Sequence, residues 1–343
     1  MRILLSHWTA LTLYRRGWVL EGSPPAEPID PCDAWKGAPG GKASNRALTQ
    51  VLASCGCCPP IHTLVPASGH RSGAHGFASH CLPRGVVDAR ATRVRLPASE
   101  QLKDAETYVV SPELLFLELA RLLGEVGAAL LGMELCGRYL RADPQDPREQ
   151  VARAGFASRR EPLMAPGEAG GFLGKQPRYV EGARHAIDGL AHVGAGARSP
   201  MESAVFLGMT LPARLGGFAI EKPQINVKME LEHREGRVLA DDLLEWDYGW
   251  SEPPLMDIEY QSRLFHGTAP RARDDRRRNE LASDGVVSLA WGPADVMDPV
   301  AFETNCLNVA RLRGRPFRTE LRDFEQRYRR LHSLLFGSGA DVG

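Results

Sequence analysis

The sequence is poor in lysine, and it has no excess of either charge. Only six of its basic residues are lysines, against 36 arginines. Lys and Arg together number 42 and so do Asp and Glu, which gives a formal net charge of +0. This balance argues against a protein that coats nucleic acid with its whole surface, although a local basic face stays compatible with it. Such a face would consist of guanidinium groups, which fit phosphate well.

Long apolar runs and an even cysteine count are also missing. No run approaches 18 consecutive apolar residues, so we expect no membrane span and no membrane partner. The apolar stretch Ile3–Leu5 is too short for a signal-peptide core. The seven cysteines are an odd number in a long chain without an export signal. We therefore expect reduced thiols in a cytoplasmic protein.

What is present indicates a folded protein with more than one core. Hydrophobic residues make up 43% and charged residues 24% of 343 residues, which is ordinary globular usage. We predict an α/β (α+β) chain with a mixed α+β domain over residues 1–140 and a linker rich in Gly, Pro, Arg and Glu over 141–177. A second domain, a mixed sheet flanked by helices, is predicted over 178–336.

Two serine–proline pairs predict helix starts, at Ser111-Pro112-Glu113 and at Ser199-Pro200-Met201-Glu202. In both, Ser takes the N-cap position and Pro the first helical position. A shorter helix is predicted to begin after Ser6. Glu202 stands three residues after its cap, which is the spacing of a capping box, and this leaves open whether its role is capping, chemistry or both.

A hairpin is predicted in the second domain, because Glu252-Pro253-Pro254 forms a turn between two apolar segments. Asp247 and Glu259 then lie on paired strands. Side chains alternate along a strand, so Asp257, Glu259 and Gln261 share one face. Burial of a carboxylate without a positively charged partner is unfavourable in free energy. A divalent cation such as Mg²⁺ or Mn²⁺ is a natural partner. The alternative is a pair of surface carboxylates on an edge hairpin.

Polar residues before, within and after this hairpin occur in a characteristic order. Glu202, Asp247, Glu259 and Gln261 are followed by His266 and by an arginine-rich segment that includes Arg273, Arg276 and Arg277. The order over Ser199–Arg313 resembles the PD-(D/E)XK nuclease superfamily, and within it the very-short-patch-repair-like endonuclease domain. The resemblance implies a restriction-endonuclease-like fold and metal-dependent hydrolysis of DNA.

The resemblance also implies a role for each matching residue. Asp247 and Glu259 hold the metal, and Gln261, which stands where many relatives carry Lys, orients the attacking water. Glu202 and His266 complete the catalytic set. The arginine-rich segment, with Arg273, Arg276 and Arg277, contacts DNA phosphates. The alternatives are a backbone-bonded His266 and a solvated arginine face.

The first half of the chain carries a weaker resemblance to AbiEi-like antitoxins. The matching pieces are Ser6-His7-Trp8-Thr9-Ala10 and Val110-Ser111-Pro112-Glu113. This implies that the N-terminal half positions nucleic acid or a protein partner. It also implies an alternative function, in which a catalytically inactive nuclease fold is a binding module of an antitoxin-like regulator.

A cluster of thiols and imidazoles lies between residues 55 and 81. Its members are Cys55, Cys57, Cys58, His62, His70, His75, His80 and Cys81. These residue types suit zinc, but Cys-Gly-Cys-Cys lacks the two-residue gap of a zinc knuckle. The sequence leaves open a zinc site and the alternative of buried thiols with loop histidines.

Overall fold

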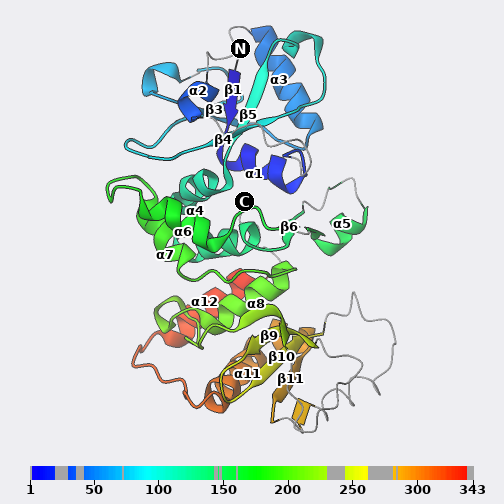
Figure 1. The fold of residues 1–343 in the computed structure, drawn as a ribbon, viewed down its shortest axis with the longest axis vertical. Coiled ribbons are helices and arrows are strands. Elements are labelled where there is room, and N and C mark those ends of the chain that lie inside the picture. The colour runs from blue at the N-terminus through cyan, green and yellow to red at the C-terminus, as the bar shows by residue number, and fades with distance from the viewer. Residues whose placement is uncertain are drawn as a thin grey trace. The chain divides into compact units, whose positions relative to one another are not determined.

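A computed structural model provides the fold of the chain (Figure 1). It describes residues 2–19, 30–35, 42–71, 73–142, 146, 149–159, 161–229, 244–261, 281–282 and 285–337. The chain forms two compact units. Unit 1 comprises Met1–Leu135, Leu140–Ala157 and Leu163–Ala191, and unit 2 comprises Cys136–Tyr139, Ser158–Pro162 and His192–Gly343. Both contain helices and a mixed sheet, which confirms the α/β prediction.

Unit 1 is built on a five-stranded sheet in the order β3-β2-β1-β5-β4. Its strands are β1 (Arg2–Leu5), β2 (Ile61–Val65), β3 (Phe77–Cys81), β4 (Ala91–Val94) and β5 (Glu106–Val110). The central strand β1 runs parallel to β5 and antiparallel to β2. Helices α1 (His7–Arg15), α2 (Pro31–Ala34) and α3 (Lys42–Ser54) belong to this unit. Ile3, Leu13 and Leu48 belong to one buried cluster, so α1 and α3 share a core with β1.

Helix α4 (Pro112–Leu135) begins where the Ser111-Pro112 pair predicts. The Leu114 N–H donates to the Ser111 hydroxyl at 3.4 Å, as expected of an N-cap. Gly124 interrupts the helix with a φ of 65°, which divides α4 into two helical stretches. Helix α7 (Ala183–Leu190) packs on α4. A Cβ on Gly189 would lie 2.5 Å from that of Ala128, so this close approach requires glycine.

The predicted linker over 141–177 differs from the structure. It holds the end of β6 (Tyr139–Arg141), α5 (Glu149–Ala154), β7 (Phe156–Ser158) and α6 (Pro166–Gly174). The chain passes for the last time from unit 1 to unit 2 after Ala191, beyond α7. Helix α6 contains four glycines, yet Leu173 is buried and α6 packs against α4 and α7. Tertiary packing therefore outweighs the low helix propensity that made this segment resemble a linker.

Unit 2 contains a four-stranded sheet in the order β11-β10-β9-β8. Its strands are β8 (Gln224–Met229), β9 (Leu244–Trp250), β10 (Met256–Tyr260) and β11 (Val287–Trp291). Strands β8, β9 and β10 are antiparallel neighbours, and β11 runs parallel to β10. The predicted hairpin and the central position of β10 are both confirmed.

Helices surround this sheet. They are α8 (Pro200–Thr210), α10 (Pro293–Met297), α11 (Pro299–Leu312) and α12 (Phe324–Phe336). Helices α8 and α12 pack side by side (Figure 1). The Tyr248 hydroxyl of β9 donates to the backbone oxygen of Glu202 at 3.0 Å, which ties the sheet to the first turn of α8. Short 3₁₀ turns elsewhere span Ser68–His70, Glu100–Leu102 and Ala213–Leu215.

Candidate functional site

The hairpin of β9 and β10 brings two predicted carboxylates side by side. Tyr248 lies opposite Ile258, and the same register continued by one residue places Asp247 opposite Glu259. Directly opposite residues share a face, with Cβ atoms about 4.5–5.5 Å apart. The Tyr260 N–H donates to Asp247 Oδ2 at 2.8 Å, so the Asp247 carboxylate is turned toward β10. The arrangement matches the predicted pairing.

Glu202 occupies the first turn of α8, and its carboxylate is held by several donors. The Ser199 hydroxyl donates to Glu202 Oε1 at 2.9 Å and accepts from the Glu202 N–H at 3.1 Å. The Arg198 N–H donates to Oε2 at 2.9 Å. Ser199 therefore caps α8 as predicted, while the Glu202 carboxylate accepts from the Arg198 N–H and the Ser199 hydroxyl, where a capping box would use the Ser199 N–H. A capping role does not exclude a chemical one.

Asp247 and Glu202 influence each other electrostatically. Burial raises the pKa of the Glu202 carboxyl, and the negative charge of Asp247 raises it further. Hydrogen bonds from Arg198, Asn226 and Ser199 act in the opposite direction. Since the register of β9 and β10, continued by one residue, also places Asp247 opposite Glu259, Asp247 is positioned between the two glutamates.

Asn226 joins this group, although the sequence analysis did not identify it. Its amide donates to Glu202 Oε2 at 2.6 Å and to the Gly196 oxygen at 3.0 Å. In the register of β8 and β9, it falls opposite Asp247. Its φ of 50° lies in the left-handed region, which Asn tolerates better than most residues. Asn is uncommon inside strands, so its presence in the apolar segment that forms β8 is the signal that could have pointed to it.

A second missed interaction joins Arg198 to Glu245 of β9. A guanidinium nitrogen of Arg198 donates to Glu245 Oε1. This hydrogen bond lowers the pKa of the Glu245 carboxyl, and the charges of Arg198, Lys228 and Arg138 add to the effect. An ion pair between residues 47 apart in sequence depends on the folded sheet, so local patterns do not reveal it.

Asp257 and Gln261, predicted to share a strand face with Glu259, differ in burial and in their hydrogen bonds. Asp257 is 0% exposed, and the Ser288 hydroxyl of β11 donates to it at 3.2 Å. Gln261 is half-buried at the end of β10, where its N–H donates to the Trp291 oxygen at 2.9 Å. Asp257 is therefore enclosed away from solvent, whereas Gln261 directly follows β10, two residues after Glu259.

The donor set fits a hard cation held by few protein ligands. Within the described residues, no group of three or more His, Cys, Asp or Glu side chains is arranged to hold a metal. Mg²⁺ commonly takes only one or two carboxylates and completes its shell with water and phosphate oxygens. Asp247 and Glu259 supply that number of carboxylates.

Other predicted members lie outside the described residues. They are His266, Arg273, Arg276 and Arg277. Their roles stay predictions.

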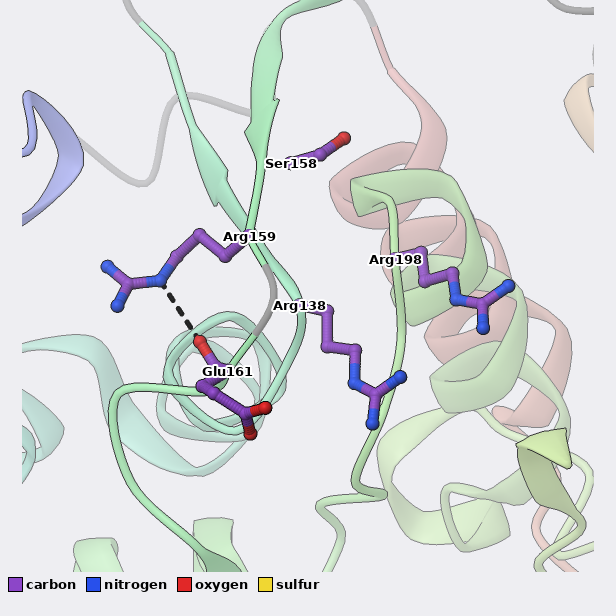
Figure 2. A pocket seen from close by; sticks show the side chains of 5 residues that line it. All are labelled: Arg138, Ser158, Arg159, Glu161 and Arg198. Atoms are coloured by element: carbon purple, nitrogen blue, oxygen red, sulfur yellow. Dashed lines mark hydrogen bonds between the residues drawn. The ribbon is translucent and has the colours of Figure 1, made fainter. Parts of the chain in front are cut away.

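A pocket of about 370 Å³ lies within unit 2 (Figure 2). The residues that line it are Arg138, Ser158, Arg159, Glu161 and Arg198. Arg198 links this pocket to the carboxylates, because its N–H binds Glu202 and its guanidinium binds Glu245.

The thiols and imidazoles of residues 55–81 do not form one cluster. Cys55 and Cys57 are buried in the apolar core of unit 1, while Cys58 is exposed. Nδ1 of His62 lies 2.8 Å from Nε2 of His80. The described part of the chain contains no zinc-like ligand group here, and the core thiols agree with the alternative of buried cysteines.

No family model, curated protein or solved structure matches this chain. In the part of the chain that the structure describes, no helix is both long and apolar enough to cross a membrane.

Proposed function

We propose that this protein is a metal-dependent endonuclease that hydrolyses DNA phosphodiester bonds in a restriction-endonuclease-like domain. The observation that carries the proposal is the antiparallel pairing of the strand of Asp247 with the strand of Glu259, with Glu202 close enough for its pKa to respond to Asp247. The element order supports it as well. Glu202 on helix α8, Asp247 on β9 and Glu259 on β10 follow one another in the order that the sequence resemblance implies.

The side chains have distinct tasks in this proposal. A divalent cation at Asp247 and Glu259, Mg²⁺ or Mn²⁺, would activate water and neutralise the leaving oxygen. Asp247 is oriented by the Tyr260 N–H, which fixes the direction of its carboxylate. Glu202 is held by Asn226 and by the Arg198 N–H, so it is placed to accept a hydrogen bond from a water at the site. The Gln261 amide both donates and accepts, which suits it to orient the attacking water.

The alternative is a catalytically inactive nuclease fold that binds nucleic acid or a protein as part of an antitoxin-like regulator. Two observations favour it. The Glu202 carboxylate already accepts three hydrogen bonds, from Arg198, Ser199 and Asn226, which suffices for a structural role. Gln261 also contributes no positive charge to a transition state. In either case we place the protein in the cytoplasm, since all seven cysteines are free thiols.

A cleavage assay tests the proposal. Purified protein is incubated with supercoiled plasmid and with single-stranded DNA, in Mg²⁺, in Mn²⁺ and in EDTA. We expect wild type to cut with metal and not with EDTA, and Glu259→Gln to lose cleavage. Glu320→Gln is a matched control, because Glu320 is an exposed glutamate of the same unit. DNA binding without cleavage by wild type would favour the inactive binding module.

A further inference from the structure

The pocket of unit 2 is lined mainly by positive charge. Its lining includes three arginines, Arg138, Arg159 and Arg198, and one acidic residue, Glu161. These residues come from three segments, and all three segments belong to unit 2. A pocket of this composition attracts an anion, and arginine forks match the geometry of phosphate oxygens.

The backbone places Arg138 and Arg198 next to each other. The Arg138 N–H donates to the oxygen of Ala197, the residue before Arg198, at 2.6 Å. The Arg159 N–H donates to the Arg138 oxygen at 2.8 Å. The backbone of Arg138 is therefore fixed between two chain segments, and Arg138 and Arg198 line the same pocket.

The side chains of the pocket take different directions (Figure 2). Those of Arg138 and Arg198 extend the same way, while that of Arg159 turns to the other side. The Arg159 Nε donates to the backbone oxygen of Glu161 at 3.1 Å, which accounts for that direction. Arg138 and Arg198 are thus the two arginines available to act together.

The positive charge of Arg138 is available to bind a ligand. It is exposed, and within the described part of the chain its guanidinium donates no hydrogen bond to a protein group. Arg198 forms an ion pair with Glu245. Arg138 affects the Glu245 carboxylate only by electrostatic interaction at longer range. Two guanidinium groups that line one pocket, with a close counter-charge on only one of them, attract an added anion.

The pocket adjoins the carboxylate group through one residue. Arg198 binds Glu202 with its backbone and Glu245 with its side chain, and Glu245 is two residues before Asp247. We infer that this pocket binds a backbone phosphate of the DNA strand whose neighbouring phosphodiester lies at Asp247 and Glu259. This inference rests on the proposed function and adds a second, metal-independent contact for the substrate strand.

Fluorescence anisotropy with a labelled single-stranded DNA oligonucleotide in EDTA tests it, because no metal-dependent cleavage occurs there. Arg138→Ala is expected to bind several-fold more weakly and to flatten the slope of log K against log salt by about 0.7, the value for one phosphate contact on a single strand. Arg138→Lys keeps the charge and should keep the slope. Arg318→Ala, an exposed arginine of the same unit, should match wild type.

The outcomes separate this inference from the proposed activity. Unchanged affinity and slope in Arg138→Ala would overturn the phosphate pocket, even if wild type cleaves DNA with Mg²⁺. An Arg138-dependent slope in a wild type that never cleaves would support the pocket and overturn the endonuclease. No binding of the oligonucleotide by wild type would overturn the pocket. Equal melting temperatures of wild type and Arg138→Ala, with weakened binding in the variant, would support a local loss of contact.

Discussion

The side-chain amide of Asn226 donates a 2.6 Å hydrogen bond to Oε2 of Glu202. The same amide donates to the Gly196 oxygen at 3.0 Å, so one residue of β8 holds both the first turn of α8 and the loop before it. Its φ of 50° turns the backbone into the left-handed region. Few residues other than Asn satisfy both the backbone and the hydrogen bonds.

Substitution of Asn226 should not follow the usual order of stability, in which an Ala variant is more stable than a Gly variant. Loss of a hydrogen bond to a charged group costs about 1.5–3 kcal/mol, and we expect Asn226→Gly to lower the free energy of unfolding by such an amount. At an ordinary strand position Ala would be more stable than Gly by about 0.5–1 kcal/mol. Here the left-handed backbone strains Ala, so Asn226→Ala should be no more stable than Asn226→Gly. Urea unfolding of the variants measures the order, and a clearly more stable Ala variant would contradict it.

The pKa of Glu202 should respond to Asp247. Burial raises this pKa and the charge of Asp247 raises it further, so Asp247→Asn should lower it. Titration of the Glu202 carboxyl carbon by NMR measures the shift. Asp188→Asn, a change in unit 1, is the control and should leave the pKa unchanged. An unaltered pKa in Asp247→Asn would mean that the two carboxylates do not interact.

Unit 1 contains a buried group of ionisable side chains that the proposed mechanism does not use. The His7 and His80 rings stack with centroids 3.7 Å apart. Burial lowers the pKa of His7 from 6.5 to about 3 and that of His80 to about 4, and neighbouring positive charges including His62 act in the same direction. Burial raises the pKa of Glu118 from 4.5 to about 8. The 3.4 Å contact between His7 and Glu118 thus joins two neutral groups at neutral pH, not an ion pair.

These shifts predict a maximum of stability in mildly acidic solution. His7 and His80 contribute fully to the free energy of unfolding above pH 6.5. This contribution is lost as the pH falls toward 4, because the imidazoles of the unfolded chain are protonated at a higher pH than those of the folded chain. Glu118 contributes fully to the free energy of unfolding below pH 4.5, and this contribution is lost as the pH rises through 8. Between pH 4.5 and 6.5 the two imidazoles increase stability with rising pH, and the single carboxyl decreases it. The effect of two groups exceeds that of one, so stability rises up to the ordinary imidazole pKa and then falls.

Urea unfolding of the full chain across this pH range measures the effect. Glu118→Gln removes the ionisable group while keeping its size, so the decline on the alkaline side should flatten. A decline of the same slope in Glu118→Gln would assign it to another group.

The local signals of the sequence were sufficient for part of this structure. The Ser111-Pro112 and Ser199-Pro200 pairs marked the starts of α4 and α8, and the prolines after Glu252 marked the turn of the hairpin. Each of these features depends on residues close together in the chain.

Features that depend on distant residues were missed. The contact of Asn226 with Glu202 and the adjacency of Arg138 and Arg198 arise only when separate segments meet in the fold. Helix α6 was missed for another reason, because its glycines disfavour a helix in isolation and burial of Leu173 against neighbouring helices stabilises it.

Gln261 is the least typical member of the proposed catalytic set. Its backbone is fixed by the hydrogen bond to Trp291, so a change of side chain should leave β10 in place. If wild type cleaves DNA, Gln261→Ala should lower turnover and leave metal affinity nearly intact, since the amide orients water and is not a main ligand. Gln261→Lys should retain cleavage. Full activity of Gln261→Ala would remove this residue from the mechanism.

The most direct test of the central claim is the affinity of the carboxylate pair for a divalent cation. Isothermal titration calorimetry with Mn²⁺ compares wild type with Asp247→Asn, Glu259→Gln and the exposed control Glu320→Gln. Removal of one charged ligand takes away much of the Coulomb attraction to a hard cation. We predict a sharp loss of affinity in Asp247→Asn and in Glu259→Gln, and wild-type affinity in Glu320→Gln. Equal Mn²⁺ affinity in all four proteins, or no binding by wild type, would contradict a metal site at Asp247 and Glu259.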